Sequence, residues 1–230
     1  MILTAHQPCY MPWLGLFNKI ELSNQFCFFD IVQYQRKDFN NRNKIISDKK
    51  PSWLNVPVND SNRFDKKINE IKISGDIWKK KHLKTIYLSY KKTEFFENYF
   101  DSFSKILQKK FIFLVDLNFE LTLFFLECLN IKTNIIKASD FDFTGKKSDL
   151  VLDMCLKLDA KKYIFGSQGK KYADLGKFKE NNIDIVFQNY EHPKYNQRSI
   201  NFYENMSIID LLFNEGPNSK KILMKNNENI

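Results

Sequence analysis

The amino-terminal segment constrains the fold of this chain most strongly, because a short apolar run gives way abruptly to a stiff polar loop. Residues 2–5 predict a buried strand, which stops at His6 and Gln7. Pro8 and Pro12 restrict the backbone of the loop that follows, so its polar groups are held in place. Open α/β sheets bind their ligands where a strand ends before a helix. The side chains of this loop that we expect to contact a ligand are His6, Gln7, Tyr10 and Trp13.

Short apolar runs alternate with amphipathic segments along the rest of the chain. We expect strands over residues 2–6, 26–33, 53–58, 68–73, 134–137, 163–165 and 183–188. We expect helices over residues 14–22, 78–89, 94–108, 114–129, 148–158, 172–181 and 208–213, the last with Ser207 as its N-cap. This alternation favours an α/β fold with a mainly parallel, Rossmann-like sheet flanked by helices. The two runs between residues 53 and 73 predict a small inserted β-hairpin.

The composition predicts one domain over residues 1–216 and a polar tail over residues 217–230 that we expect to fray. The sequence contains no run of about 18 apolar residues, so we expect no membrane span. The amino terminus lacks a secretory pattern, and the four cysteines are scattered without metal-binding spacing. We therefore expect a cytoplasmic protein with reduced cysteines, no metal and no cofactor.

The net charge of +9 is open to two interpretations. One is a nucleic-acid-binding face. The other is a generic basic surface, because nearly all of the basic residues are Lys, whereas Arg is preferred for bidentate phosphate contacts. Either surface would attract anionic substrates such as nucleotide sugars. The arginines are Arg36, Arg42, Arg63 and Arg198.

A second polar cluster follows the second predicted strand. Asp30 interrupts an apolar run, so its carboxylate must be paired or lie at the exposed end of the strand. If the first two strands are parallel neighbours, His6 and Asp30 reach the same edge, where His6 is a candidate general base. The alternative is that Asp30 only orients a loop or caps a helix. The other candidates of this cluster are Gln33, Asp38, Asn41, Arg42, Asn43 and Lys44. The donors of residues 41–44 suit a phosphate or carboxylate, with an Asn-rich surface turn as the alternative.

Two further clusters follow later strands. The first is a glycine turn in which backbone N–H groups could approach a phosphate, with a plain turn as the alternative; it contains Gly166, Gly169 and Tyr172. The second alternates aromatic rings with amide and imidazole groups, which suits a sugar or a base; it contains Gln188, Tyr190, His192 and Gln197. Cys9 beside His6 is a candidate nucleophile or a small core residue. We expect His82, among lysines on a predicted helix, to lie on the surface.

These motifs resemble the WbqC-like family over nearly the whole chain. The amino-terminal matches are His6-Gln7-Pro8-x-Tyr10-x-Pro12-Trp13-x-Gly15, Phe29-Asp30-x-Val32-Gln33-Tyr34, Asn41-Arg42-Asn43 and Trp53-Leu54-x-Val56-Pro57-Val58. The later matches are Ser148-Asp149-Leu150, Gly166-x-x-Gly169-x-x-Tyr172, Phe187-Gln188-x-Tyr190-x-His192-Pro193-x-Tyr195-x-Gln197 and Ser207-x-x-Asp210-Leu211-Leu212-Phe213-Asn214-x-Gly216. The sequence departs from the family pattern at Cys9, Leu16 and Gln35, none of which removes a candidate functional group.

The resemblance implies a role in bacterial O-antigen (lipopolysaccharide) or other surface-polysaccharide synthesis, in which an amino acid, notably glycine, is transferred to an amino sugar. The loop at His6 is also distantly similar to the phosphate-binding turn of Rossmann-like nucleotidyltransferases, a likeness of fold alone.

We therefore expect a transferase that acylates the amine of a nucleotide-linked amino sugar. In this hypothesis His6 accepts the proton of the attacking amine, and Asp30 or Asp38 orients it. Arg42, Lys44 and the turn over residues 166–169 hold the diphosphate. The sugar or base pocket is lined by Tyr10, Trp13, Tyr190 and Gln197. The second substrate is an activated amino-acid donor, for which an aminoacyl-tRNA is one candidate.

The alternative is a nucleic-acid-binding protein, with tRNA as a candidate partner. The net charge of +9 and the abundant aromatic residues favour it. Lysines spread along the chain, rather than gathered into a stripe with interleaved rings, count against it.

Overall fold

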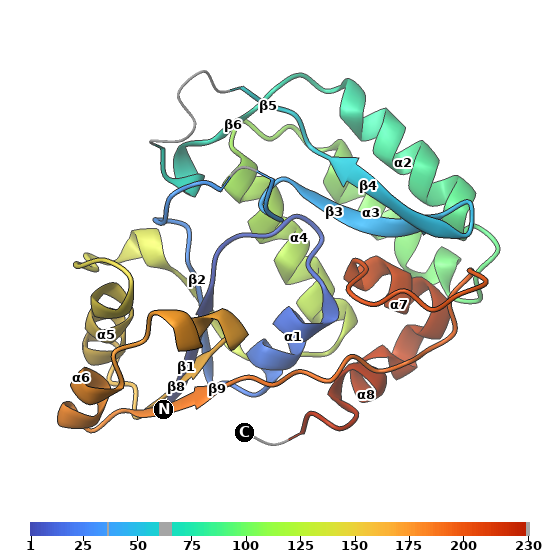
Figure 1. The fold of residues 1–230 in the computed structure, drawn as a ribbon. Coiled ribbons are helices and arrows are strands. Elements are labelled where there is room, and N and C mark those ends of the chain that lie inside the picture. Colours follow the sequence, from blue (N-terminus) through green and yellow to red (C-terminus); the bar gives the residue numbers. More distant parts are fainter. Residues whose placement is uncertain (36, 60–65, 229–230) are drawn as a thin grey trace.

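The computed structural model describes residues 1–35, 37–59 and 66–228 (Figure 1). Its centre is a parallel sheet whose strands lie in the order β7-β2-β1-β8-β9. The bounds of these strands are Ile2–His6 for β1, Gln25–Phe28 for β2, Asn134–Lys137 for β7, Lys162–Phe165 for β8 and Asp184–Phe187 for β9. The prediction of a mainly parallel, Rossmann-like sheet is confirmed.

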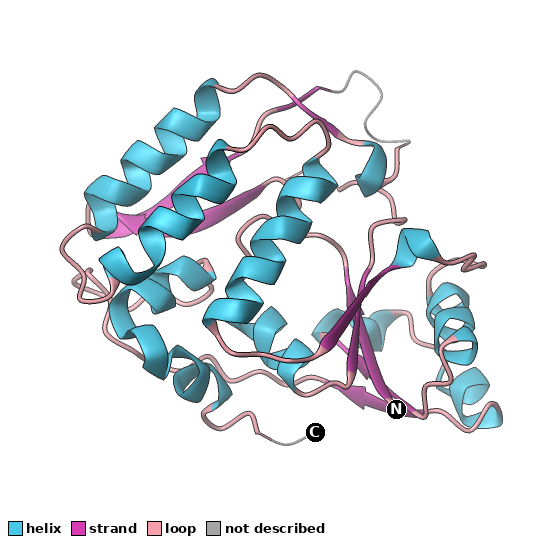
Figure 2. Ribbon diagram, turned by 180° about the vertical axis from the view of Figure 1, so that it is seen from behind, coloured by secondary structure: helices cyan, strands magenta, loops and turns pink. Residues whose placement is uncertain are grey.

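Helices cover both faces of this sheet, and the two faces have separate apolar clusters. Helices α5 (Ser148–Lys157) and α6 (Leu175–Glu180) pack on one face. Helices α1 (Leu14–Glu21) and α4 (Leu114–Cys128) pack on the other, where Phe17 contacts Phe125 edge-on. Figure 2 shows this layering from behind. The sheet is therefore buried on both sides, which explains why its strands have few polar residues.

The described residues between β2 and β7 (29–35, 37–59 and 66–133) build most of the second half of the molecule. They form the antiparallel hairpin of β3 (Arg42–Ser47) and β4 (Lys50–Asn55). They also form the short pair β5 (Val58–Asn59) and β6 (Lys72–Ile73), then α2 (Ile77–Tyr90) and α3 (Phe96–Gln108). Helix α7 (Ile208–Glu215), with Ser207 as its N-cap as predicted, joins this half through contacts with α3 and β3.

The structure corrects four local predictions. The inserted hairpin begins at Arg42 rather than near residue 53, and residues 68–70 form a 3₁₀ turn rather than a strand. The second strand ends at Phe28 because the backbone N–H of Asp30 turns back to the Phe28 carbonyl, 3.0 Å away. The expected frayed tail contains helix α8 (Ser219–Met224), because its Leu223 is fully buried. The helices in the described residues lack the combined length and apolar character of a membrane span.

Candidate functional site

The candidate site lies where the strand order reverses direction. From β1 the chain adds β2 and β7 on one side and then β8 and β9 on the other, so the switch point lies between β1 and β8. Ligands of open α/β sheets bind at this point, beyond the carboxyl ends of the strands. His6 ends β1, level with Phe28 on the neighbouring β2 and with Lys137 one strand further, on β7, and Gly166 directly follows β8.

His6 is partly buried, and one of its two ring nitrogens is hydrogen-bonded within the protein. Its Nδ1 lies 2.7 Å from the carbonyl oxygen of Gln7, which can only accept, so Nδ1 carries the proton. The other nitrogen, Nε2, has no hydrogen-bond partner among the described residues. Burial, helped by the charge of Lys19 and opposed by Asp38, lowers the pKa of His6 to about 4. The imidazole is therefore neutral at pH 7, with the lone pair of Nε2 free.

The carboxylate near His6 belongs to Asp38. The Gln7 side-chain amide donates to its Oδ2 over 3.0 Å, and the Phe39 backbone N–H donates to its Oδ1 over 2.7 Å. The Arg42 guanidinium donates to the backbone carbonyl of Asp38 over 3.3 Å. This chain of contacts connects the first loop to the start of the β3–β4 hairpin.

The Asp30 carboxylate is engaged with the turn that follows β7 rather than with His6. Its side chain is buried, and Oδ1 accepts a 2.9 Å hydrogen bond from the backbone N–H of Ser139. Its backbone carbonyl accepts from the N–H of Asn69. This geometry favours the loop-orienting alternative, because the carboxylate ties the end of β2 to the turn that follows β7.

Lys19 is a candidate that sequence reasoning missed. It lies on α1 with only 3% of its surface exposed, and its Nζ donates to the carbonyl of Ala5 over 2.9 Å. Burial lowers its pKa to about 8. The sequence does place this lysine inside an apolar predicted helix. A helix with a single buried face would, however, leave such a lysine exposed to solvent, so the sequence did not single it out. Only the tertiary structure shows that α1 is buried all round from Leu14 to Ile20.

Cys9 packs beside His6 as a protonated thiol. Its Sγ lies 3.7 Å from Nδ1 of His6 and donates to the Gln7 carbonyl over 3.5 Å. Burial, and secondarily Asp38, raise the pKa of the thiol. Because Nδ1 carries a proton, it cannot take one from Cys9, so the core-residue alternative fits this geometry better than the nucleophile.

Arg42 and Lys44 form a cationic aromatic surface with Trp53 on the hairpin. The guanidinium carbon of Arg42 lies 4.3 Å from the centroid of the Trp53 ring, and Nζ of Lys44 lies 5.7 Å from it. Phe39 contacts the same ring at 5.8 Å between centroids. Trp53 nevertheless exposes 47% of its surface. Trp53 was not among the predicted site residues, although it lies in a motif of the family.

The amides of the Asn-rich segment hold the loops together. Asn43 donates to the carbonyl of Met11 over 2.7 Å, and Asn41 donates to the carbonyl of Val56 over 2.8 Å. Both side chains are buried. Met11 has a φ of 45°, an uncommon value for a residue with a side chain, and the contact with Asn43 helps hold that conformation. These two amides are therefore occupied by the protein itself.

Tyr10 lies in the core. Its hydroxyl is 2.9 Å from Nδ1 of His82, which exposes only 5% of its surface, so the prediction of a surface His82 is wrong. Of the lysines near His82 on α2, Lys80 and Lys81 are exposed, whereas Lys79 is buried on the same side of the helix. Trp13 packs edge-on against Tyr190 and lies over Gly15, where a Cβ atom would come within 2.2 Å of its ring.

The glycine turn is a 3₁₀ turn over Ser167–Lys171. A Cβ atom at Gly166 would meet open space, whereas one at Gly169 would lie 2.6 Å from Phe165. Gly169 therefore serves close packing, and Gly166 lies at the open end of β8. Tyr172 is exposed and rests on Phe165. Gln33 is also exposed, bridged to Lys67 away from the sheet.

The side chains of the fourth predicted cluster, in residues 188–197, bind mainly to other parts of the protein. Gln188 donates to the carbonyl of Gly15 over 2.8 Å, and Gln197 donates to the buried carboxylate of Asp210 over 2.9 Å. Nδ1 of His192 lies 3.0 Å from the carbonyl of Pro193, and the Tyr190 hydroxyl donates to the carbonyl of Leu223. None of these contacts reaches His6.

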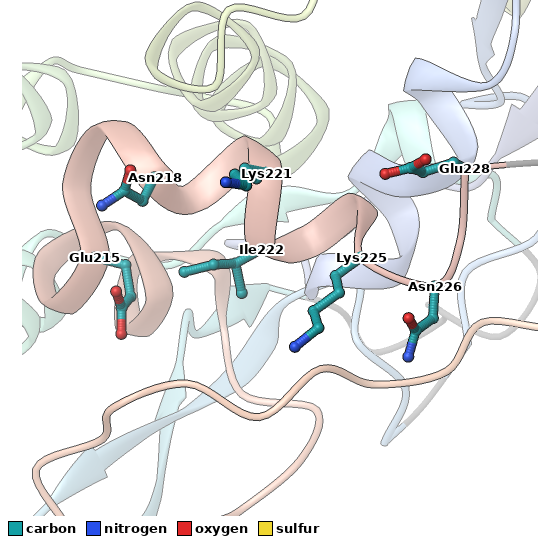
Figure 3. A pocket seen from close by; sticks show the side chains of 7 residues that line it. All are labelled: Glu215, Asn218, Lys221, Ile222, Lys225, Asn226 and Glu228. Carbon is teal, nitrogen blue, oxygen red and sulfur yellow. The ribbon is translucent and has the colours of Figure 1, made fainter.

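Two cavities lie away from the switch point. One of about 800 Å³ adjoins α8, where Glu215, Lys221 and Lys225 are among its lining residues (Figure 3). The other, of about 230 Å³, lies beside the β5–β6 pair. Neither is lined by a predicted site residue.

The fold defines an α/β protein with a Rossmann-like sheet, and its polar loop lies at the topological switch point, where ligands of such sheets bind. The model of the WbqC-like protein family matches residues 7–222, so the chain belongs to that family. It is 31% identical over 212 residues to the uncharacterized protein Rv1507c of Mycobacterium tuberculosis, covering 91% of this chain and 92% of the relative. No solved structure matches the chain. The resemblance predicted from the motifs is confirmed.

Proposed function

We propose that this protein is a transferase that acylates the amine of a nucleotide-linked amino sugar, with glycine or another amino acid as the acyl group. The observation that carries the proposal is His6: a neutral imidazole with a free Nε2 at the switch point of the sheet. The family resemblance, with its implied role in surface-polysaccharide synthesis, supports the choice of substrate.

In the proposed reaction the sugar amine attacks the carbonyl carbon of the activated amino-acid donor. The new C–N bond forms, the bond from the carbonyl carbon to the leaving group breaks, and Nε2 of His6 accepts the proton that the nitrogen loses. The contact from Nδ1 to Gln7 fixes the ring orientation, and the contact from Gln7 to Asp38 holds the loop. Cys9 takes no covalent part in this mechanism, because its thiol stays protonated.

The β3–β4 hairpin supports the nucleotide part of the proposal. Trp53 offers an exposed ring on which a base can stack, and Arg42 and Lys44 bring positive charge to the same ring. Asp38 joins this surface to the loop of His6 through its contacts with Arg42 and Gln7. In this arrangement the nucleotide binds at the hairpin and the amino sugar extends toward the switch point.

The decisive test is the activity of His6→Ala, assayed by mass spectrometry with UDP- and dTDP-linked amino sugars and activated glycine donors, including glycyl-tRNA. We expect a loss of about 10²–10⁴-fold, the usual contribution of a general base. Cys9→Ala is the matched control from the same loop and should retain activity within about threefold, since no covalent step uses the thiol.

Two outcomes would contradict the proposal. One is His6→Ala activity within about threefold of wild type. The other is no binding of any nucleotide sugar, together with RNA binding that weakens steeply with salt, which would favour the nucleic-acid-binding alternative.

A further inference from the structure

Lys19 is a buried charge without a counter-ion. It exposes 3% of its surface, and its Nζ makes one hydrogen bond, to the neutral carbonyl of Ala5. An ammonium group has three donors, and burying such a charge without a partner is costly. No ion pair involves Lys19 among residues 1–35, 37–59 and 66–228.

A second buried lysine shows what a structural role looks like in this chain. Lys79 exposes 8% of its surface, but its Nζ lies 2.6 Å from the carboxylate of Asp76 and also donates to the carbonyl of Lys109. Lys79 thus has a counter-ion and a second acceptor. Lys19 is buried more deeply, but its ammonium has no counter-ion and only one acceptor, the carbonyl of Ala5.

None of the groups that face Lys19 forms an ion pair with its ammonium among the described residues. Cys9 is a protonated thiol and His6 is neutral. Asp38 acts on His6 and Cys9, but its carboxylate is bound by the Gln7 amide and the Phe39 N–H. Among the described residues, no carboxylate therefore forms an ion pair with the Lys19 ammonium, which lies at the carboxyl end of β1 beside the switch point.

We propose that Lys19 binds an anionic oxygen group of the ligand, a phosphate or a carboxylate, at the carboxyl end of β1 beside His6. This inference takes its site from the proposed function but does not depend on acyl transfer. The nucleotide-linked sugar brings phosphate to the site, and the amino-acid unit brings a carboxyl group, so the two sources share the same chemistry.

Binding of an anion should be accompanied by proton uptake. Burial lowers the pKa of Lys19 to about 8, so roughly half of the side chain is neutral at pH 8 in the free protein. A bound anion favours the charged form and raises this pKa. Uptake at pH 8 should approach about half a proton and should fall toward zero at pH 6.5. His6 adds little at pH 8 because its own pKa starts at about 4.

The experiment is isothermal titration calorimetry of the full chain, in buffers of different ionisation enthalpy, with three probes. Pyrophosphate and uridine diphosphate test the phosphate source, and N-acetylglycine tests the carboxylate source. We expect Lys19→Met to weaken binding of the active probe by about tenfold or more and to abolish proton uptake at pH 8. Lys19→Arg should retain binding without uptake, and Lys79→Met is the matched buried control with unchanged affinity.

Equal affinities of wild type and Lys19→Met would overturn the inference, as would the absence of binding of all three probes to wild type. If Lys19→Met does not fold, proton uptake by wild type at pH 8 but not at pH 6.5 decides the question. Anion binding through Lys19 in a protein without transferase activity would refute the proposed function alone. Full transferase activity in Lys19→Met would refute this inference alone.

Discussion

At the scale of single residues, burial is what determines the acid–base chemistry of the first loop. It is the largest cause of the shifted pKa at His6, Lys19 and Cys9, and neighbouring charges come second. At pH 7 the loop and the adjoining helix α1 therefore contain a neutral imidazole, a mostly charged ammonium and a protonated thiol. This combination provides one base and one cation, without an activated nucleophile.

Lys19→Met should stabilise the protein by on the order of 2 kcal/mol at pH 7, because it removes a buried charge with no counter-ion. The folded-state pKa of about 8 lies below the unfolded value near 10.5. The unfolded state therefore binds more protons between these values, and wild-type stability rises with pH across that window. Urea unfolding at pH 7 and pH 9.5 measures both effects. A variant less stable than wild type at pH 7 would contradict this account.

His82 should make the protein sensitive to acid. Burial lowers its pKa to about 4, below the unfolded value of 6.5, so the stability it contributes is present above pH 6.5 and is lost as the pH falls toward 4. His82→Gln can keep the contact with the Tyr10 hydroxyl but cannot take up a proton. We expect it to reduce the loss of stability between pH 6.5 and 4 by about 2 kcal/mol, measured by thermal unfolding. An unchanged pH profile would exclude His82 as the cause.

At the scale of elements, the β3–β4 hairpin carries a cationic aromatic surface that its strand pairing creates. Lys44 and Trp53 are directly opposite in the register, and Arg42 lies two residues before Lys44 on the same face. The period of two along a strand therefore brings both cations to one ring. The sequence alone predicted a ligand-binding donor set at Arg42 and Lys44, with a surface turn as the alternative. It did not predict a strand there or connect either residue with Trp53.

Trp53→Ala should weaken nucleotide binding by about fivefold or more, because stacking of a base on an aromatic ring contributes roughly 1–3 kcal/mol. In wild type, a stacked nucleotide should quench the fluorescence of this exposed tryptophan, and the variant should lose that response. Tyr87→Ala is a matched control, since Tyr87 is an exposed ring with the Lys91 ammonium 5.2 Å from its centroid. Equal nucleotide affinity in Trp53→Ala and wild type would show that the base binds elsewhere.

At the scale of the whole molecule, a buried carboxylate joins segments that are far apart in the sequence. Asp210 on α7 accepts hydrogen bonds from the Tyr90 hydroxyl at 2.7 Å, the Tyr195 hydroxyl at 2.8 Å and the Gln197 amide at 2.9 Å. Burial raises the pKa of Asp210, and these three donors act in the opposite direction. The contacts tie α7 to α2 and to the segment that returns from the sheet.

Asp210→Ala should destabilise the protein by about 3–5 kcal/mol, because it leaves three donors without their shared acceptor. Asp184→Ala, at an exposed position on β9, is the control and should change stability by less than about 0.5 kcal/mol. Both are measured by urea unfolding. A loss below about 1 kcal/mol for Asp210→Ala would mean that packing, rather than the carboxylate, holds these segments together.

The alternation of strands and helices made the fold class predictable from the sequence. Strands such as β1 and β8 are short, apolar and bounded by breakers, so local patterns identify them. The hairpin was misplaced because Arg42–Ser47 contains Arg, Asn and Lys, which a local pattern assigns to a turn. Its strand conformation depends on pairing with Lys50–Asn55, which is a contact between segments.

The sequence by itself determined the class of sheet, the family and the position of His6 at the end of the first strand, because each is encoded in local order and spacing. The tertiary structure decided which polar groups are free. It engages Tyr10, Gln188 and Gln197 in contacts within the protein, pairs Gln7 with Asp38, and buries Lys19 beside His6. Burial and hydrogen-bond partners come from residues distant in the chain, so no local pattern can reveal whether a polar side chain is available to a ligand.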